Sequence, residues 1–395
     1  MAEQAARPQP IRSFLKYAGL AFALVLAGCG AVVPRGHGPA TEAPPPKRAS
    51  GPVGALPEDL ERQRVALLVP LSGTNAAVGQ SIANAVNLAL LDTGGRKVRI
   101  TTYDTSVGAA AAARRAVAEG SKLFLGPLLA EDVRAVAPVA RQAGIPVIAF
   151  SNDTSVAGNG VYLMGFTPNQ SIDRVVRYAR SKGAVRFAAL APTGLYGRSA
   201  STSMIKIVEA AGGKMVALEN YDRAAPSIKA ATQKLTAEAD FDALLIADSG
   251  RIAVQIVPLV RKGGDTTARI MGTDLWNAES GLAAEPALNG AWFASVSDVL
   301  YRQLVTKYQA RFGRPPYRFA SLGYDAVLLT VRIAKDWKIG DSFPTRLLSA
   351  SDGFSGVDGA FRFGDNGVAE RSLEVRQIGP GGLIVVSPAA RGFGE

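Results

Sequence analysis

Along most of the chain, short apolar runs alternate with longer segments in which apolar residues recur every three or four positions. Residues 65–69 form an unbroken apolar run, which is typical of a strand buried on both faces of a sheet. Ile82, Val86 and Leu90 then follow at helical spacing, and Gly94 ends that segment. A strand followed by a helix is the repeating unit of an α/β protein.

The same unit recurs several times, and a break at Phe166-Thr167-Pro168 separates two series. Further strands are predicted at residues 98–103, 123–125 and 146–150 in the first series, and at residues 187–190, 216–218, 243–247 and 269–272 in the second. Consecutive strand–helix units form parallel sheets that helices cover on both faces. The pattern therefore predicts two doubly wound α/β domains.

Polar or glycine-rich loops follow most of these predicted strands. In open parallel sheets, ligands bind outside the carboxyl ends of the strands, and two lobes with facing loops form a cleft. The residues of these loops are therefore our candidate cleft residues: Ser72, Gly73, Leu128, Leu129, Ser151, Asn152, Asp153, Thr154, Tyr196, Asp248, Ser249 and Asp274.

The N-terminal region carries three basic residues before an apolar stretch at residues 18–26. This order is that of an export signal, and the apolar stretch is too short to cross a membrane. Leu26-Ala27-Gly28-Cys29 follows and contains the only cysteine of the chain. It resembles the lipobox of bacterial lipoproteins, which implies removal of residues 1–28 as a signal peptide and acylation of Cys29. Two or more acyl chains would anchor the protein on a membrane.

Residues 29–62 contain seven prolines and almost no large apolar side chains. Such a segment buries too little surface to offset its chain entropy, and proline favours an extended backbone. We expect a tether that holds the globular part away from the lipid surface, on the periplasmic face of the cell envelope. Gly30, rather than an aspartate, follows Cys29, which by analogy with enteric lipoproteins favours the outer membrane.

Cys29 and the single histidine, His37, both precede the predicted domains. The domains therefore lack the residues for Cys–His or Ser–His nucleophilic pairs, imidazole metal sites and disulfides. We predict a protein that is not an enzyme and that holds no metal and no cofactor. Catalysis by carboxylates alone, with Asp153 and Asp274 as candidates, is the enzymatic alternative that composition leaves open.

The formal net charge of the chain is +11, and removal of residues 1–28 leaves 41 basic and 32 acidic residues, or +9. In an exported protein this charge favours anionic lipid or cell-wall polymer as a partner over nucleic acid. We expect no nucleic-acid partner.

Several short motifs occur in a fixed order along residues 63–395. They are residues 65–73 with Gly79, Gly126, Gly144-Ile145-Pro146-Val147-Ile148, Tyr196-Gly197, Gly272 and residues 321–326. Together they resemble the type I periplasmic-binding-protein fold of the leucine-binding superfamily. The resemblance implies an α/β fold of two doubly wound parallel-sheet lobes joined by a three-stranded hinge.

In that superfamily the chain crosses the hinge three times, so the resemblance also implies domain boundaries. Lobe 1 would comprise residues 63–167 and 299–358, and lobe 2 residues 168–298 and 359–395. The hinge would lie near Thr167-Pro168, Ser297-Asp298 and Asp358-Gly359.

A closer resemblance is to one subgroup, the lipoproteins that activate penicillin-binding proteins. The shared segments are residues 68–73, 126–129 and 356–359, followed by Arg371. The resemblance implies an envelope lipoprotein that stimulates a peptidoglycan synthase, a penicillin-binding protein, by contact. The alternative is a solute-binding protein that delivers an amino acid or amide to an ABC importer.

Amino-acid-binding relatives hold the ligand with hydroxyl-bearing residues of lobe 1 and with a tyrosine and an acidic residue of lobe 2. Tyr196 and Asp274 stand at the matching positions of lobe 2. In lobe 1, a carboxylate at Glu131 or Asp153 would repel a ligand carboxylate in a desolvated cleft, which disfavours a simple amino-acid pocket but not a pocket for a cationic or amide ligand. Two plainer roles stay open, a helix cap for Asp274 and partial burial within the lobe for Tyr196.

Overall fold

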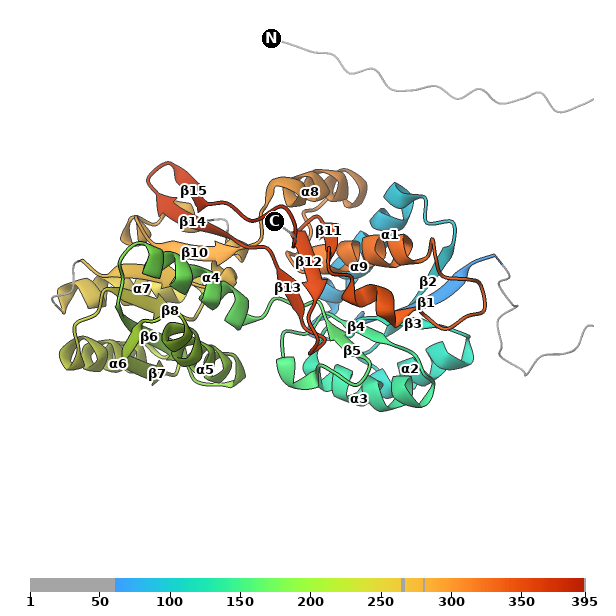
Figure 1. The fold of residues 1–395 in the computed structure, drawn as a ribbon, viewed down its shortest axis with the longest axis horizontal. Coiled ribbons are helices and arrows are strands. Elements are labelled where there is room, and N and C mark those ends of the chain that lie inside the picture. Colours follow the sequence, from blue (N-terminus) through green and yellow to red (C-terminus); the bar gives the residue numbers. More distant parts are fainter. Residues whose placement is uncertain (1–60, 264–266, 280, 394–395) are drawn as a thin grey trace, which may run out of the picture. The chain divides into compact units, whose positions relative to one another are not determined.

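The computed structural model describes residues 61–263, 267–279 and 281–393. The predicted signal peptide, the acylated Cys29 and the tether as far as residue 60 lie outside the described residues. Figure 1 shows the described chain as sheets flanked by helices, with the two larger sheets in separate lobes.

The sheet of lobe 1 has five parallel strands in the order β2-β1-β3-β4-β5. Its strands are β1 (Gln63–Val69), β2 (Val98–Asp104), β3 (Leu123–Leu125), β4 (Val147–Ala149) and β5 (Val161–Leu163). Helices α1 (Ala76–Thr93), α2 (Ala109–Ala118), α3 (Ala130–Gln142), α8 (Val299–Phe312) and α9 (Ala320–Ile333) pack in this lobe. Strand β1 lies between β2 and β3, and its Val65 is paired with Ile100 on one side and with Leu123 on the other.

Two apolar clusters cover the two faces of this sheet. Val65 and Leu67 point into the cluster that contains side chains of α1 and α9. Ala66 and Leu68 point into the cluster that contains side chains of α2 and α3. Because both faces are covered, alternation between apolar and polar residues disappears along β1, and the predicted doubly buried strand is confirmed.

The sheet of lobe 2 has seven strands in the order β15-β14-β10-β9-β8-β6-β7. Its strands are β6 (Arg186–Pro192), β7 (Lys214–Tyr221), β8 (Ala243–Ile246), β9 (Arg269–Gly272), β10 (Trp292–Ser295), β14 (Glu374–Gly379) and β15 (Gly382–Ser387). Helices α4 (Pro168–Ser181), α5 (Leu195–Ala210), α6 (Ala225–Glu238) and α7 (Gly250–Lys262) cover it. Strands β6 to β10 are parallel, and β14 pairs antiparallel with β10. The predicted α/β fold with parallel-sheet lobes is confirmed.

The structure differs from the expected hinge position at Asp358-Gly359, because a small antiparallel sheet lies there. It consists of β11 (Phe354–Gly356), β12 (Gly359–Phe363) and β13 (Ala369–Arg371). Phe361 and Phe363 of β12 belong to the apolar cluster of lobe 1. The chain therefore does not leave lobe 1 at Asp358-Gly359, because residues 356–359 form a tight turn in which Gly359 adopts φ +84°. It joins the sheet of lobe 2 only at β14. The other expected boundaries between lobe 1 and lobe 2 remain a proposal.

Short 3₁₀ helices occupy several loops: η1 (Thr154–Val156), η2 (Asp274–Ala278), η3 (Leu282–Ala284), η4 (Pro286–Leu288) and η5 (Thr345–Ser349). Across the part of the chain that the structure describes, no helix combines the length and apolar character needed to cross a membrane.

Candidate functional site

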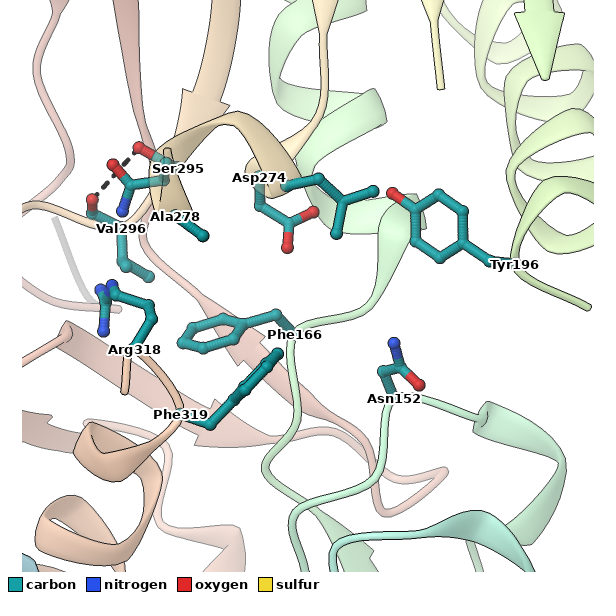
Figure 2. A pocket seen from close by; sticks show the side chains of 11 residues that line it. Asn152, Phe166, Tyr196, Asp274, Ala278, Ser295, Val296, Arg318 and Phe319 are labelled. Carbon is teal, nitrogen blue, oxygen red and sulfur yellow. Dashed lines mark hydrogen bonds between the residues drawn. The ribbon is translucent and has the colours of Figure 1, made fainter. Parts of the chain in front are cut away.

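A pocket lies between the strand-end loops of the two lobes. Its lining residues are Asn152, Phe166, Tyr196, Asp274, Leu275, Asn277, Ala278, Ser295, Val296, Arg318 and Phe319. Three of the candidate cleft residues, Asn152, Tyr196 and Asp274, are among them. Figure 2 shows the Asp274 carboxylate pointing toward the side of the pocket formed by Phe166. The cavity measures about 60 Å³, well below the roughly 300 Å³ at which sites for drug-sized ligands begin.

Asp274 follows β9 and begins the short helix η2. Its Oδ1 accepts a hydrogen bond of 2.9 Å from the Ser171 hydroxyl of α4. Removal from water raises the pKa of Asp274 to about 6, although the Ser171 hydrogen bond and the charges of Arg318 and Arg371 act in the opposite direction. None of the ion pairs between described residues includes Asp274, so its negative charge faces the pocket without a contacting cation.

Tyr196 is held at the pocket wall by the start of α5. Gly197 brings this first turn against the end of β6, where a Cβ atom would lie 1.6 Å from the Pro192 carbonyl oxygen. The hydroxyls of Tyr196 and Thr273 share a hydrogen bond of 2.9 Å. Burial raises the pKa of Tyr196 well above its usual value, so Tyr196 is a neutral phenol that can stack on or hydrogen-bond to a ligand.

Arg318 is the basic residue of the pocket lining, and its charge is already balanced. Its Nη2 lies 2.7 Å from Oδ1 of the fully buried Asp358, and Nη1 donates to the Ser321 hydroxyl at 2.8 Å. The guanidinium also lies 4.0 Å from the ring centre of Tyr301. Burial lowers the pKa of Arg318, but the attraction of Asp358 outweighs it and raises this pKa overall.

The remaining candidate cleft residues do not line this pocket. Ser72 donates its hydroxyl to Asp104, and Gly73, at φ +69°, forms the turn before α1. Leu128 packs on the lobe 1 cluster, and Leu129 precedes α3. Asp248 lies buried against Tyr221 and Arg223, and Ser249 precedes α7. Ser151 accepts from the Asp153 amide, and Thr154 is an exposed residue of η1.

The carboxylate of Asp153, which we expected to repel a ligand carboxylate, points away from the pocket. Its carboxylate forms an ion pair of 2.5 Å with Arg134 and accepts the backbone N–H of Ser155 at 3.0 Å. These contacts lower its pKa despite desolvation. Asp153 is thus turned into its own loop, and Glu131 lies in the first turn of α3. Neither lines the pocket, so the repulsion that we expected there does not follow from them.

Sequence reasoning missed the other eight lining residues, among them two phenylalanines and an arginine, Phe166, Phe319 and Arg318. Phe166 stands at the break between the two strand–helix series, and Arg318 and Phe319 precede the motif at residues 321–326. These positions were visible as boundaries, but no strand end marked them as ligand contacts.

Among the described residues, no group of three or more His, Cys, Asp or Glu side chains is placed to hold a metal ion. The polar groups of the pocket are a carboxylate, a phenol, amides, a hydroxyl and a paired guanidinium. This set can recognise a ligand through hydrogen bonds and charge.

Comparison with known proteins identifies the family to which the chain belongs. The sequence model of the family described as "Periplasmic binding protein" matches residues 62–382, and the chain belongs to this family. Members are non-enzymatic ligand-binding proteins with an extracytoplasmic location, which confirms the prediction that the protein is not an enzyme.

Two solved structures of similar proteins have the same fold as this chain. A putative branched-chain amino acid ABC transporter protein from Rhodospirillum rubrum is 21% identical, with a TM-score of 0.72 over 82% of this chain and 100% of the other. A branched-chain amino acid transporter substrate binding protein from Streptococcus pneumoniae, solved with isoleucine, is 21% identical, with a TM-score of 0.60 over 83% of this chain and 100% of the other.

A curated relative, the uncharacterized protein RP748 of Rickettsia prowazekii, is 26% identical over 178 residues. The match covers 45% of this chain and 48% of that protein, so the chain spans about half the length of this relative.

Proposed function

We propose that the chain is an exported, lipid-anchored solute-binding protein that takes up an amino acid or amide and delivers it to an ABC importer. The carboxylate of Asp274 carries this proposal. It faces a pocket between two lobes, and no described basic side chain forms an ion pair with it. A ligand ammonium or amide N–H would supply the missing partner in a charge-assisted hydrogen bond.

The opposite wall of the pocket indicates what the rest of the ligand is like. Phe166, Phe319 and Val296 offer apolar surface, and Arg318 is neutralised by Asp358. A ligand carboxylate would therefore meet no unpaired cation among the lining residues.

Activation of a peptidoglycan synthase was the function that the sequence resemblance favoured. The family match and the two transporter binding proteins named above support transport instead, and they give no support to a penicillin-binding protein as partner. Acylation at Cys29 remains part of the proposal, since it concerns a residue outside the described structure. Placement in the outer membrane stays a prediction that belongs with the activator hypothesis, because an ABC importer lies in the inner membrane.

Calorimetric titration with three probes tests the ligand class. Leucinamide carries an ammonium without a carboxylate, isoleucine carries both, and benzoate carries only a carboxylate. We expect binding of leucinamide and of isoleucine, and none of benzoate. Binding of benzoate alone would overturn the proposed role of Asp274.

Two matched variants locate the contact. Asp274→Asn should weaken leucinamide binding by at least about tenfold, because a charge-assisted hydrogen bond becomes a neutral one. Asp153→Asn, the same chemical change outside the pocket, should leave it unchanged. A pull-down from detergent-solubilised envelope tests the partner: a permease supports transport, whereas recovery of a peptidoglycan synthase alone would overturn it.

A further inference from the structure

Charge is divided unevenly between the two ends of the lobe 1 sheet. The segments at the amino ends of the strands and after α9, residues 61–64, 96–99, 119–122 and 335–341, contain eight basic and four acidic residues. The loops at the carboxyl ends, residues 70–75, 104–108, 126–131 and 150–155, contain three acidic residues and no basic one. These four strand-end loops on the pocket side thus carry no basic residue, whereas the segments at the opposite end of the sheet are basic.

Hydrogen bonds hold the basic segments against one another. Gln63 pairs with Val98 in the sheet, and its side chain donates to the carbonyl of Lys338 at 2.5 Å. Lys97 Nζ donates to the carbonyl of Lys335 at 3.1 Å, and the backbone N–H of Lys122 donates to the carbonyl of residue 64 at 2.8 Å. The segments therefore form one surface, although they are far apart in the sequence.

We call this surface the basic face and define it by its basic residues: Arg62, Arg64, Arg96, Lys97, Arg99, Lys122, Lys335 and Lys338. Its carboxylates are Glu61, Glu119, Asp336 and Asp341. The face has a net charge of +4 by this count.

The loop after α9 gives the basic face a fixed shape and an apolar element. Trp337 is buried, packs edge-on against Phe343 with ring centres 5.0 Å apart, and donates from Nε1 to the carbonyl of Asp341 at 3.0 Å. Between these anchored residues, Lys338 is exposed and Ile339 keeps 43% of its surface exposed. A cation beside an exposed apolar side chain suits the headgroup region of a membrane.

The point at which the chain enters lobe 1 indicates which partner the basic face binds. The described chain enters lobe 1 at Glu61, within this face, directly after the segment predicted to lead from acylated Cys29. An anchored tether keeps the face at a high effective concentration next to the bilayer. We propose that the basic face docks on anionic phospholipid headgroups of the membrane that carries the anchor, which turns the pocket-bearing end of lobe 1 outward.

Hydrogen exchange on tethered protein tests this docking. The chain from Cys29 onward is coupled through that thiol, its only one, to a maleimide lipid in vesicles, so that attachment does not depend on natural acylation. On vesicles rich in phosphatidylglycerol, we expect exchange at residues 96–99 and 335–341 to slow by at least about tenfold relative to phosphatidylcholine vesicles. The slowing should disappear in about 0.5 M salt, where exposed charges are screened.

Two variants that each lose four positive charges distinguish binding through the basic face from an effect of the net charge of the protein. The variant R96Q/K97Q/K335Q/K338Q should lose the slowing, because each basic residue near an anionic membrane strengthens binding about fivefold. The control K206Q/K214Q/K229Q/K262Q removes four exposed lysines of lobe 2 and should keep it. Equal exchange on both vesicle types, loss of slowing in both variants, or protection only by an added anionic cell-wall polymer would overturn the proposal.

Discussion

Arg371 donates a hydrogen bond from Nη2 to the backbone carbonyl of Met164 at 2.6 Å. The contact joins the chain at the end of β13 to the segment just after β5, two stretches at which the chain passes between the lobes. The same guanidinium lies 4.8 Å from the ring centre of Phe166, which lines the pocket. The position of the pocket wall therefore depends on a buried arginine of the hinge.

Replacement of this arginine should destabilise the protein strongly. Arg371→Leu removes a cation that interacts with the buried carboxylates of Asp325 and Asp358, and loss of one partner of a buried ionic group costs about 3–5 kcal/mol. We expect a decrease of at least about 3 kcal/mol in the free energy of unfolding, measured by urea denaturation.

Arg362→Leu is the matched control for this prediction. Arg362 pairs with Glu370 at 2.8 Å, but both side chains are largely exposed, at 39% and 50%. Such pairs contribute about 0–1 kcal/mol. A loss of less than about 1 kcal/mol for Arg371→Leu, as expected for the control, would show that Arg371 contributes no more than a surface charge.

Gly356 leaves room for the carboxylate of Asp325. A Cβ atom at residue 356 would lie 2.3 Å from Asp325 Oδ2 and 2.5 Å from Oδ1. Asp325 accepts the backbone N–H of Val357 at 2.7 Å, so displacement of its side chain would also break that bond. Gly356→Ala should therefore lower the free energy of unfolding by about 1–3 kcal/mol, the range for overpacked sites.

Gly381→Ala provides the comparison for this prediction, since a Cβ atom there would meet nothing within 4 Å. It should change the free energy of unfolding by less than about 0.5 kcal/mol. Equal stability of the Gly356→Ala variant and the parent in urea denaturation would mean that the turn between β11 and β12 accommodates the methyl group by moving.

Asp325 should make stability depend on pH. Burial and the negative charge of Asp358 raise its pKa to about 7, against about 3.9 for an unfolded aspartate. Between these values the folded state retains a proton that the unfolded state has released. The contribution of Asp325 is therefore fully present below about pH 4 and is lost as the pH rises through 7.

The Asp325→Asn variant isolates this effect, because it cannot titrate. The difference in unfolding free energy between parent and variant should shift in favour of the variant as the pH rises from 5 to 8, measured by urea denaturation at each pH. A difference that does not change with pH would contradict the raised pKa of Asp325.

The sequence predicted the sheets well because buried parallel strands leave a strong signal. In residues 65–69 of β1 and in β8, residues on both faces of the sheet are apolar, so each segment appears as an unbroken apolar run. The third hinge crossing was misplaced because residues 356–359 have the glycine-rich composition of a linker as much as of a hairpin. Composition does not distinguish a chain that turns back from one that continues into the other lobe.

The sequence also did not predict the direction in which side chains of the strand-end loops point. Asp153 and Asp274 both follow strands, but one turns to Arg134, 19 residues earlier in the chain, and the other faces the pocket. That difference depends on a tertiary ion pair with no fixed spacing in the sequence. Arg318 and Phe319 reach the pocket from the segment before α9, so a search confined to strand ends does not find them.

Ligand affinity should depend on the ionisation of Asp274. Its pKa of about 6 means that the carboxylate is largely protonated at pH 5 and largely ionised at pH 7. The α-amino group of leucinamide remains mostly charged over this range, so only the protein changes its charge. We expect calorimetric affinity for leucinamide to rise by roughly tenfold from pH 5 to pH 7, because each unit below the pKa costs up to a factor of ten. The Asp274→Asn variant should show no such rise, and an equal rise in both proteins would assign the effect to another group.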